Sequence, residues 1–168
     1  MDHRLAFHDV IPRHHKYHRR EDLDSFEFTY KAEITSVYKL TEQENLYRIR
    51  ILDNEDRRHF SFRPGQFIML ELPGIGEAPI SISSSPSNHE DIELCIRAVG
   101  NLTNVLSRAE RGTHVGIRGP FGTSFPMERM HGGNILLIAG GLGLVPLRSP
   151  IAHVQEHRSM FEKVDIVY

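Results

Sequence analysis

The sequence has very little cysteine, since Cys95 is its single thiol. One cysteine cannot form an internal disulfide, a four-cysteine zinc site or an iron–sulfur cluster. Disulfides persist in oxidising compartments, so their absence favours a reducing one. We therefore expect a cytoplasmic location.

Long apolar runs and an excess of one charge are also missing. No apolar stretch approaches the ~20 residues that a membrane-spanning helix needs, and the N-terminus is polar and charged, unlike a secretory signal. Lys and Arg number 20 against 22 Asp and Glu, which excludes the basic footprint of a protein that binds nucleic acid or an anionic membrane. A length of 168 residues suits one good domain and is short for two.

Residues 1–29 differ in composition from the rest of the chain. Residues 14–22 are dense in charge and imidazole, and this predicts an N-terminal extension that orders against a partner. His14 and His18 are four residues apart and would share a helix face as metal ligands, but no carboxylate or cysteine spacing supports them. A solvated basic arm is favoured, and no metal site is predicted.

Residues 30–130 show the two-residue alternation of β-strands. Within residues 46–52, Tyr47, Ile49 and Ile51 fall on one face. Residues 53–56 and 63–66 have the composition of turns. Other strands are predicted at residues 31–38, 67–72, 91–99 and 113–118, and a helix at 101–111. Many short strands with one helix predict an antiparallel β-barrel.

Residues 131–168 show a different pattern. A continuous apolar run at 134–139 predicts a strand buried on both faces. A glycine-rich turn, a helix at 147–161 and a second buried strand at 164–168 complete a βαβ unit. Two strands with one helix are too few for independent stability. We therefore expect either a piece of a longer chain or a sheet that a partner completes.

Five motifs occur in a fixed order, at residues 62–67, 76–86, 97–103, 118–122 and 139–147. Together they resemble the ferredoxin–NADP reductase superfamily over residues 32–168. The resemblance is nearest to the FAD-binding electron-transfer subunits of multisubunit enzymes, namely the gamma subunit of sulfhydrogenases, the B subunit of anaerobic sulfite reductase and the electron-transfer subunit of dihydroorotate dehydrogenase. It implies a FAD-binding β-barrel of the ferredoxin-reductase type at 30–130, followed by the start of an α/β nucleotide-binding domain at 131–168.

The resemblance implies that Ala78, Pro79, Ile80 and Ser81 run beside the flavin. Ser81 matches the residue near flavin N5, where a small polar group tunes the redox step. Many members carry arginine and tyrosine where this chain has Ala78 and Ile80, and these hold the FAD pyrophosphate and stack on the isoalloxazine. The Glu-Ala-Pro sequence fits the sulfhydrogenase branch, and Ile80 still offers apolar surface. The alternative is a serine-rich turn without a ligand.

A second flavin segment is implied at Cys95, Ile96, Arg97, Gly100, Leu102 and Thr103. The strand backbone would face the flavin and its ribityl chain, and the helix N-terminus that comes next would favour a phosphate. Arg97 would supply the positive charge that Ala78 lacks, and the alternative is a solvated strand arginine. Cys95 is interpreted as a packed residue rather than a reactive thiol.

The resemblance places a nicotinamide loop at Gly140, Gly141, Leu142, Gly143 and Pro146. Glycines allow the backbone to approach a pyrophosphate at the N-terminus of the next helix. FAD and NAD(P)H are thus the implied cofactors.

The expected function is electron transfer between NAD(P)H and an iron–sulfur partner within a larger redox complex. The flavin carries the chemistry, so no side chain is predicted to be a catalytic acid or nucleophile. The rival hypothesis is a non-catalytic scaffold or docking subunit that keeps the barrel but lacks nicotinamide turnover.

Overall fold

The computed structural model describes residues 29–168. The predicted extension, with His14 and His18, lies outside the described residues except for Thr29. The strands are β1 (Tyr30–Lys39), β2 (Glu44–Ile51), β3 (Phe67–Leu72), β4 (Gly76–Ser81), β5 (Ile92–Arg97), β6 (His114–Phe121), β7 (Ile135–Ile138) and β8 (Val164–Val167). The helices are α1 (Asn54–His59), α2 (Asn101–Leu106) and α3 (Leu144–Glu156), with 3-10 turns η2 (Met127–Met130), η3 (Gly141–Gly143) and η4 (Arg158–Met160).

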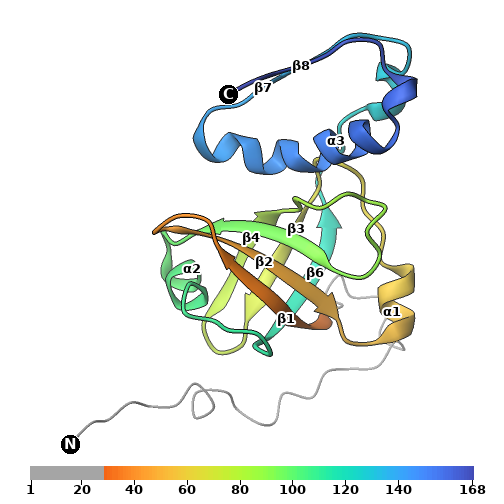
Figure 1. Cartoon of the computed structure of the whole chain (residues 1–168). Coiled ribbons are helices and arrows are strands. Elements are labelled where there is room, and N and C mark those ends of the chain that lie inside the picture. Colours follow the sequence, from red (N-terminus) through yellow and green to blue (C-terminus); the bar gives the residue numbers. More distant parts are fainter. Residues whose placement is uncertain (1–28) are drawn as a thin grey trace, which may run out of the picture.

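The first six strands form one antiparallel sheet in the order β4-β3-β6-β1-β2-β5 (Figure 1). Its two end strands come together where the chain leaves β4. The Ser83 amide donates to the Glu93 carbonyl at 2.8 Å, and the Ser83 hydroxyl accepts from the Cys95 amide at 3.3 Å. A main-chain hydrogen bond and a serine hydroxyl thus link the two ends, and the sheet curls around a single core.

Alternation along the strands builds that core. Tyr47, Ile49 and Ile51 are all buried, as the sequence predicted. Each buried side chain of this size contributes about 1.5–3 kcal/mol of transfer free energy. The Tyr47 hydroxyl donates to the Leu106 carbonyl at 3.0 Å, which ties β2 to α2. Burial raises the pKa of Tyr47, so the phenol stays protonated as that donor.

Residues 53–56, predicted as a turn, instead begin helix α1, so that prediction is wrong. The Asp53 carboxylate accepts from the amides of Glu55 at 2.8 Å and Asp56 at 2.9 Å. This is an N-cap, which uses the same residue types as a turn.

Helix α2 is shorter than predicted, because it ends at Leu106 rather than at residue 111. Beyond it, the amides of Arg108 and Ala109 donate to carbonyls three residues back, at 3.1 Å and 2.8 Å. The apolar spacing continues through Ala109 while the backbone has already turned. The predicted turn at 63–66 is confirmed, with the Gln66 amide donating to the Arg63 carbonyl at 3.2 Å.

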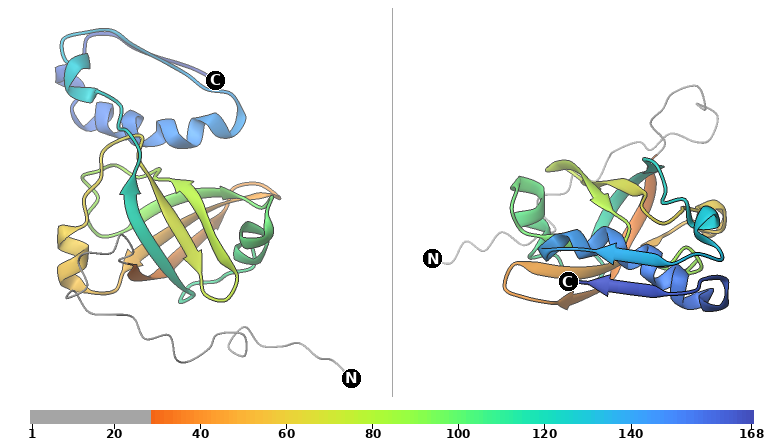
Figure 2. Two further views of the ribbon diagram at one scale, coloured as in Figure 1. Left: turned by 180° about the vertical axis from the view of Figure 1, so that it is seen from behind. Right: turned by 90° about the horizontal axis from the view of Figure 1, so that it is seen from above.

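The remaining strands, β7 and β8, pair in parallel, and α3 connects them. Helix α3 lies between this small sheet and the six-stranded sheet (Figure 2). The prediction that both strands are buried on both faces is wrong. Leu136 is 58% exposed and Ile138 is 66% exposed, and most of β8 is exposed as well. The physical reason is that α3 covers one face only, where Ile135 packs with Val154 and Phe161.

No helix within residues 29–168 is long and apolar enough to cross a membrane.

Candidate functional site

Two grooves lie where α3 meets the six-stranded sheet. The first, here called the β5 groove, has a volume of about 480 Å³. Its lining residues are Leu40, Thr41, Glu44, Leu46, Cys95, Arg97, Gly141, Leu142, Leu144, Val145, Arg148 and Tyr168. The second, here called the serine-loop groove, has a volume of about 340 Å³. Its lining residues are Ser83, Ser84, Ser85, Asn88, Glu93, Arg148, Ile151, Ala152, Gln155 and Glu156.

Strand β5 supplies the wall that both grooves share. Its even-numbered residues, Ile92, Leu94 and Ile96, are buried in the core. Its odd-numbered residues therefore point outward, and they bring Glu93 to one groove and Cys95 and Arg97 to the other. Of the predicted β5 residues, Cys95 and Arg97 line the β5 groove and Ile96 does not.

The predicted β4 residues, Ala78, Pro79, Ile80 and Ser81, line neither groove. They lie on an end strand that pairs with β3 alone. Ile80 packs against the core and Pro79 is exposed. The strand offers open backbone edge and no cation, because its one charged residue is Glu77, which accepts two bonds from Arg118 at 2.6 Å and 2.7 Å.

Gly100, Leu102 and Thr103 lie at the start of α2, away from the lining of both grooves. The Thr103 hydroxyl accepts from the amides of Val99 at 3.0 Å and Gly100 at 2.8 Å. Leu102 is buried. Thr103 therefore serves the cap of its own helix, and its hydroxyl and the Gly100 amide are already used within the chain.

The glycine loop is the other wall of the β5 groove. Gly141 and Leu142 line the groove. Gly140 precedes η3, Gly143 caps α3, and Pro146 lies in its first turn. A Cβ atom added at Gly140, Gly141 or Gly143 would meet no heavy atom within 4 Å. The loop thus leaves open space at the N-terminus of a 13-residue helix, the setting in which a phosphate group binds.

Two polar side chains that line the grooves were not predicted. Arg148 lines both grooves and donates to Glu93 at 3.1 Å. Glu156 accepts from the hydroxyls of Ser85 at 2.7 Å and Ser87 at 2.9 Å. The Ser85 hydrogen bond, assisted by Ser87, lowers the pKa of Glu156. Arg148 holds α3 to β5, and Glu156 holds it to the loop between β4 and β5. Arg148 comes after the glycine loop in sequence, which is the one signal that points to it.

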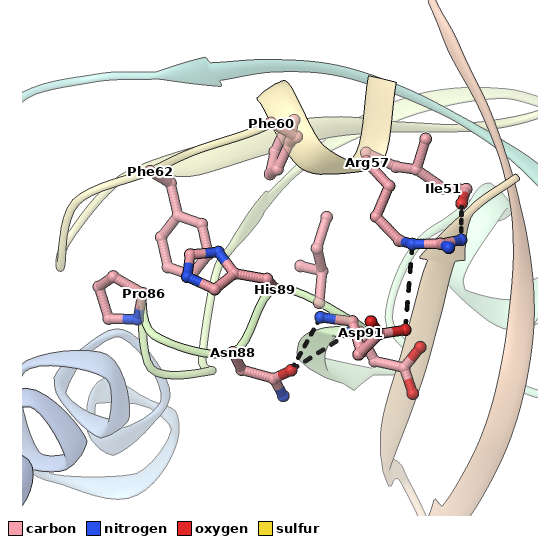
Figure 3. Close-up of a pocket in the computed structure, with 10 residues that line it drawn as sticks. Ile51, Arg57, Phe60, Phe62, Pro86, Asn88, His89 and Asp91 are labelled. Carbon is pink, nitrogen blue, oxygen red and sulfur yellow. Dashed lines mark hydrogen bonds and ion pairs between the residues drawn. The ribbon is translucent and has the colours of Figure 1, made fainter. Parts of the chain in front are cut away.

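A third cavity lies on the flank of the barrel beside α1 (Figure 3). Arg57 donates to the Ile51 carbonyl at 3.0 Å, and Asn88 accepts from the Glu90 and Asp91 amides at 3.2 Å and 3.3 Å. Its volume of about 10 Å³ is room for about one water molecule. It is too small for a cofactor, whereas the two grooves are large enough, and we take them as the candidate site.

Burial shapes the chemistry of Cys95. Desolvation raises the pKa of this thiol, although Arg148 and Arg97 act in the opposite direction. A raised pKa means a smaller thiolate fraction at a given pH, and the thiolate is the nucleophile. We expect iodoacetamide to alkylate Cys95 more slowly at pH 8 than it alkylates glutathione, with the midpoint of the rate at a higher pH. Mass spectrometry of the alkylated chain measures the rate of Cys95 alkylation at each pH without ambiguity, because the chain has one cysteine. A midpoint at or below that of glutathione would contradict it.

The family profile described as Oxidoreductase FAD-binding domain matches residues 31–125. The chain is 44% identical over 140 residues to the sulfhydrogenase 2 subunit gamma of Pyrococcus furiosus, covering 83% of this chain and 48% of that protein. It is 36% identical over 124 residues to a probable dihydroorotate dehydrogenase B (NAD(+)), electron transfer subunit, of Archaeoglobus fulgidus, covering 71% and 47%. The chain thus spans about half the length of these curated relatives, at 48% and 47%.

The fold of this chain is similar to that of several solved structures. A ferredoxin NADP+ reductase from Neisseria gonorrhoeae with bound FAD and NADP superposes with a TM-score of 0.69 at 20% identity, over 82% of this chain and 56% of that one. The FAD/NAD-binding domain of a nitric oxide dioxygenase from Vibrio cholerae gives 0.70 at 15% identity, over 82% and 60%. Identities this low show the fold alone. They confirm the predicted barrel of the ferredoxin-reductase type, which a βαβ unit follows in the structure.

Proposed function

Because this chain belongs to the oxidoreductase FAD-binding domain family, we propose that it is the flavin-carrying part of an electron-transfer subunit. It would work between NAD(P)H and an iron–sulfur partner in a multisubunit redox complex. The named relatives, a sulfhydrogenase gamma subunit and an electron-transfer subunit, support this role. The single cysteine is compatible with a cytoplasmic setting.

The β5 groove carries the proposal. It brings Cys95 and Arg97 of the barrel within one cavity with Gly141 and Leu142 of the glycine loop. Its walls are mostly apolar, with leucine, valine and tyrosine side chains, and Arg97 and Arg148 supply positive charge. An apolar slot with a few cations suits a planar ring attached to a phosphate chain.

A bound flavin would supply hydride acceptance and stepwise release of electrons. The chain's own residues would orient it. Ile80 and the open edge of β4 would offer apolar surface and backbone groups, and Ser81 would offer a hydroxyl for a hydrogen bond. The resemblance also assigns Gly100, Leu102 and Thr103 to the phosphate chain; they lie outside both grooves and the Gly100 amide already donates to Thr103, so the proposal does not rest on them. The glycine loop would let a nicotinamide dinucleotide approach the backbone closely.

The visible spectrum of the purified chain tests the proposal. We expect a flavin spectrum after incubation with FAD and removal of free cofactor, and bleaching when NADH or NADPH is added without oxygen. A Gly143→Ala variant should slow bleaching while keeping the fold, because its Cβ would enter only open space. Gly133→Ala controls for replacing a glycine outside the loop; because its Cβ would lie 3.3 Å from the Met130 carbonyl oxygen, urea unfolding of both variants is compared alongside. Failure of the wild-type chain to retain any flavin would refute the proposal.

A second candidate is a docking subunit that holds FAD without nicotinamide turnover. The exposed outer face of β7 and β8, with Leu136, Ile138 and Val167, favours it, because such an apolar face is typical of a surface that another polypeptide covers. Flavin that stays bound but is bleached by neither NADH nor NADPH would select this candidate over the first.

A further inference from the structure

Among the residues that the structure describes, Arg148 is the one whose side chain lines both grooves. It extends from α3 toward β5, where its guanidinium donates to Glu93 at 3.1 Å. Its side chain is 37% exposed, so the charge remains within reach of a ligand in either groove.

Glu93 has two arginine partners. Arg48 of β2 contacts one carboxylate oxygen at 3.0 Å, and Arg148 contacts the other at 3.1 Å. Glu93 is 13% exposed, and an unpaired carboxylate at such a position is costly. Because Arg48 remains in place, the Glu93 carboxylate keeps one ion-pair partner when Arg148 moves away.

The other arginines near the site lack this freedom. Arg97 pairs with Glu44, which is 12% exposed. Among the described residues, Glu44 has only the Thr41 hydroxyl as a further partner. Arg118 holds Glu77 through both carboxylate oxygens, at 2.6 Å and 2.7 Å. Moving either arginine would break the pair that fixes its strand.

The surroundings of Arg148 also suit a phosphate. Its helix begins at Leu144, directly after the glycine loop, so the positive end of the helix dipole faces the β5 groove. The Leu144 amide donates to carbonyls of the glycine loop and Pro146 has no N–H, so the guanidinium of Arg148 would supply the donors for a phosphate. The Cβ positions of Gly141 and Gly143 open onto empty space. A planar guanidinium binds phosphate oxygens in pairs, which the ammonium of a lysine cannot do.

We propose that Arg148 leaves Glu93 to Arg48 and binds the diphosphate of a dinucleotide in the β5 groove. This inference rests on the proposed function and names the cation of that site. FAD and a nicotinamide dinucleotide both carry a diphosphate. The experiment therefore has to show which of these two ligands Arg148 binds.

Calorimetric titration of the full chain tests it, with two probes. FAD is titrated into the cofactor-free chain, and ADP-ribose into the FAD-saturated chain. Arg148→Gln should weaken one of the two affinities by about 10- to 100-fold, as expected for loss of a charge-assisted hydrogen bond. Weaker binding of FAD would assign Arg148 to the flavin diphosphate. Weaker binding of ADP-ribose would assign it to the diphosphate of a nicotinamide dinucleotide. Arg148→Lys should recover part of the affinity.

Two variants separate ligand binding from bracing of α3. Glu93→Gln removes the ion pair and leaves the arginine, so affinity should be unchanged or higher. If Arg148 only braced α3, Glu93→Gln would weaken binding as much as Arg148→Gln, and that result would overturn the inference.

Arg111→Gln, at an exposed site outside both grooves, controls for the change in net charge. Equal affinities of wild type and Arg148→Gln for both probes would also overturn it, while leaving the proposed function intact. Failure of wild type to bind FAD would refute the proposed function itself.

Discussion

Replacing Gly65 by alanine is expected to lower the free energy of unfolding by about 2–5 kcal/mol. Two costs add at this turn. The backbone has φ +97°, a conformation that side chains with a Cβ rarely adopt. The new Cβ would also lie 2.7 Å from Cδ2 of Phe125 and 3.2 Å from its backbone nitrogen. Urea unfolding followed by circular dichroism measures the change.

Gly112→Ala is the matched control for the backbone cost. Gly112 has φ +89°, and a Cβ there would meet nothing within 4 Å. The difference between the two variants therefore isolates the clash with Phe125. Adding Phe125→Leu to Gly65→Ala should recover part of the loss by shortening the side chain. Equal losses for Gly65→Ala and Gly112→Ala would show that Phe125 yields, contrary to the prediction.

The clash matters because Phe125 joins the two sheets. Its amide donates to the Pro64 carbonyl at 2.8 Å, and its ring packs on the small cluster beneath β7. The turn at residues 63–66 therefore fixes where the chain leaves the barrel for the glycine loop. A shift at Gly65 would move the wall of the β5 groove that Gly141 provides.

Local patterns predicted strands such as β2, β3 and β5 well, because each of these buries alternate residues. The alternation of Tyr47, Ile49 and Ile51 identifies the inward face of β2 without any knowledge of its neighbours. Asp53 could not be assigned in the same way. A carboxylate that accepts nearby amides occurs in turns and at helix N-caps alike, and the conformation of the next residues decides between them.

Burial of β7 and β8 depends on more distant parts of the polypeptide. The apolar run that contains Leu136 and Ile138 is typical of a strand covered on both sides. Here α3 covers one side only, so both residues are exposed. A sequence pattern reports what a strand is suited to, and the elements around it determine what it buries.

The candidate site shows the same difference between local sequence patterns and long-range packing. The motifs predicted Cys95, Arg97, Gly141 and Leu142, which meet in one groove. They did not predict the contacts that hold the groove together. Arg148 and Glu93 are 55 positions apart, and Ser85 and Glu156 are 71 apart. No local pattern predicts such pairs, because each depends on how α3 packs against β5 and against the loop between β4 and β5.

Leu94→Ala is expected to lower the free energy of unfolding by about 2–5 kcal/mol, through lost transfer free energy and a residual cavity. Leu94 is fully buried on β5, opposite Tyr47 of β2. Its neighbour Cys95 points to the groove, so Cys95→Ala should cost less than about 1 kcal/mol. Urea unfolding of the two variants compares adjacent positions on one strand.

The comparison tests the premise of the site as well as the core. If β5 has one core face and one groove face, stability depends on Leu94 and groove chemistry depends on Cys95. Bound FAD should then slow alkylation of Cys95 in the wild-type chain. In the Leu94→Ala variant that protection should fade as the strand loosens. Equal stability losses at both positions would mean that β5 is packed on both faces, and a cofactor could not lie against Cys95 and Arg97.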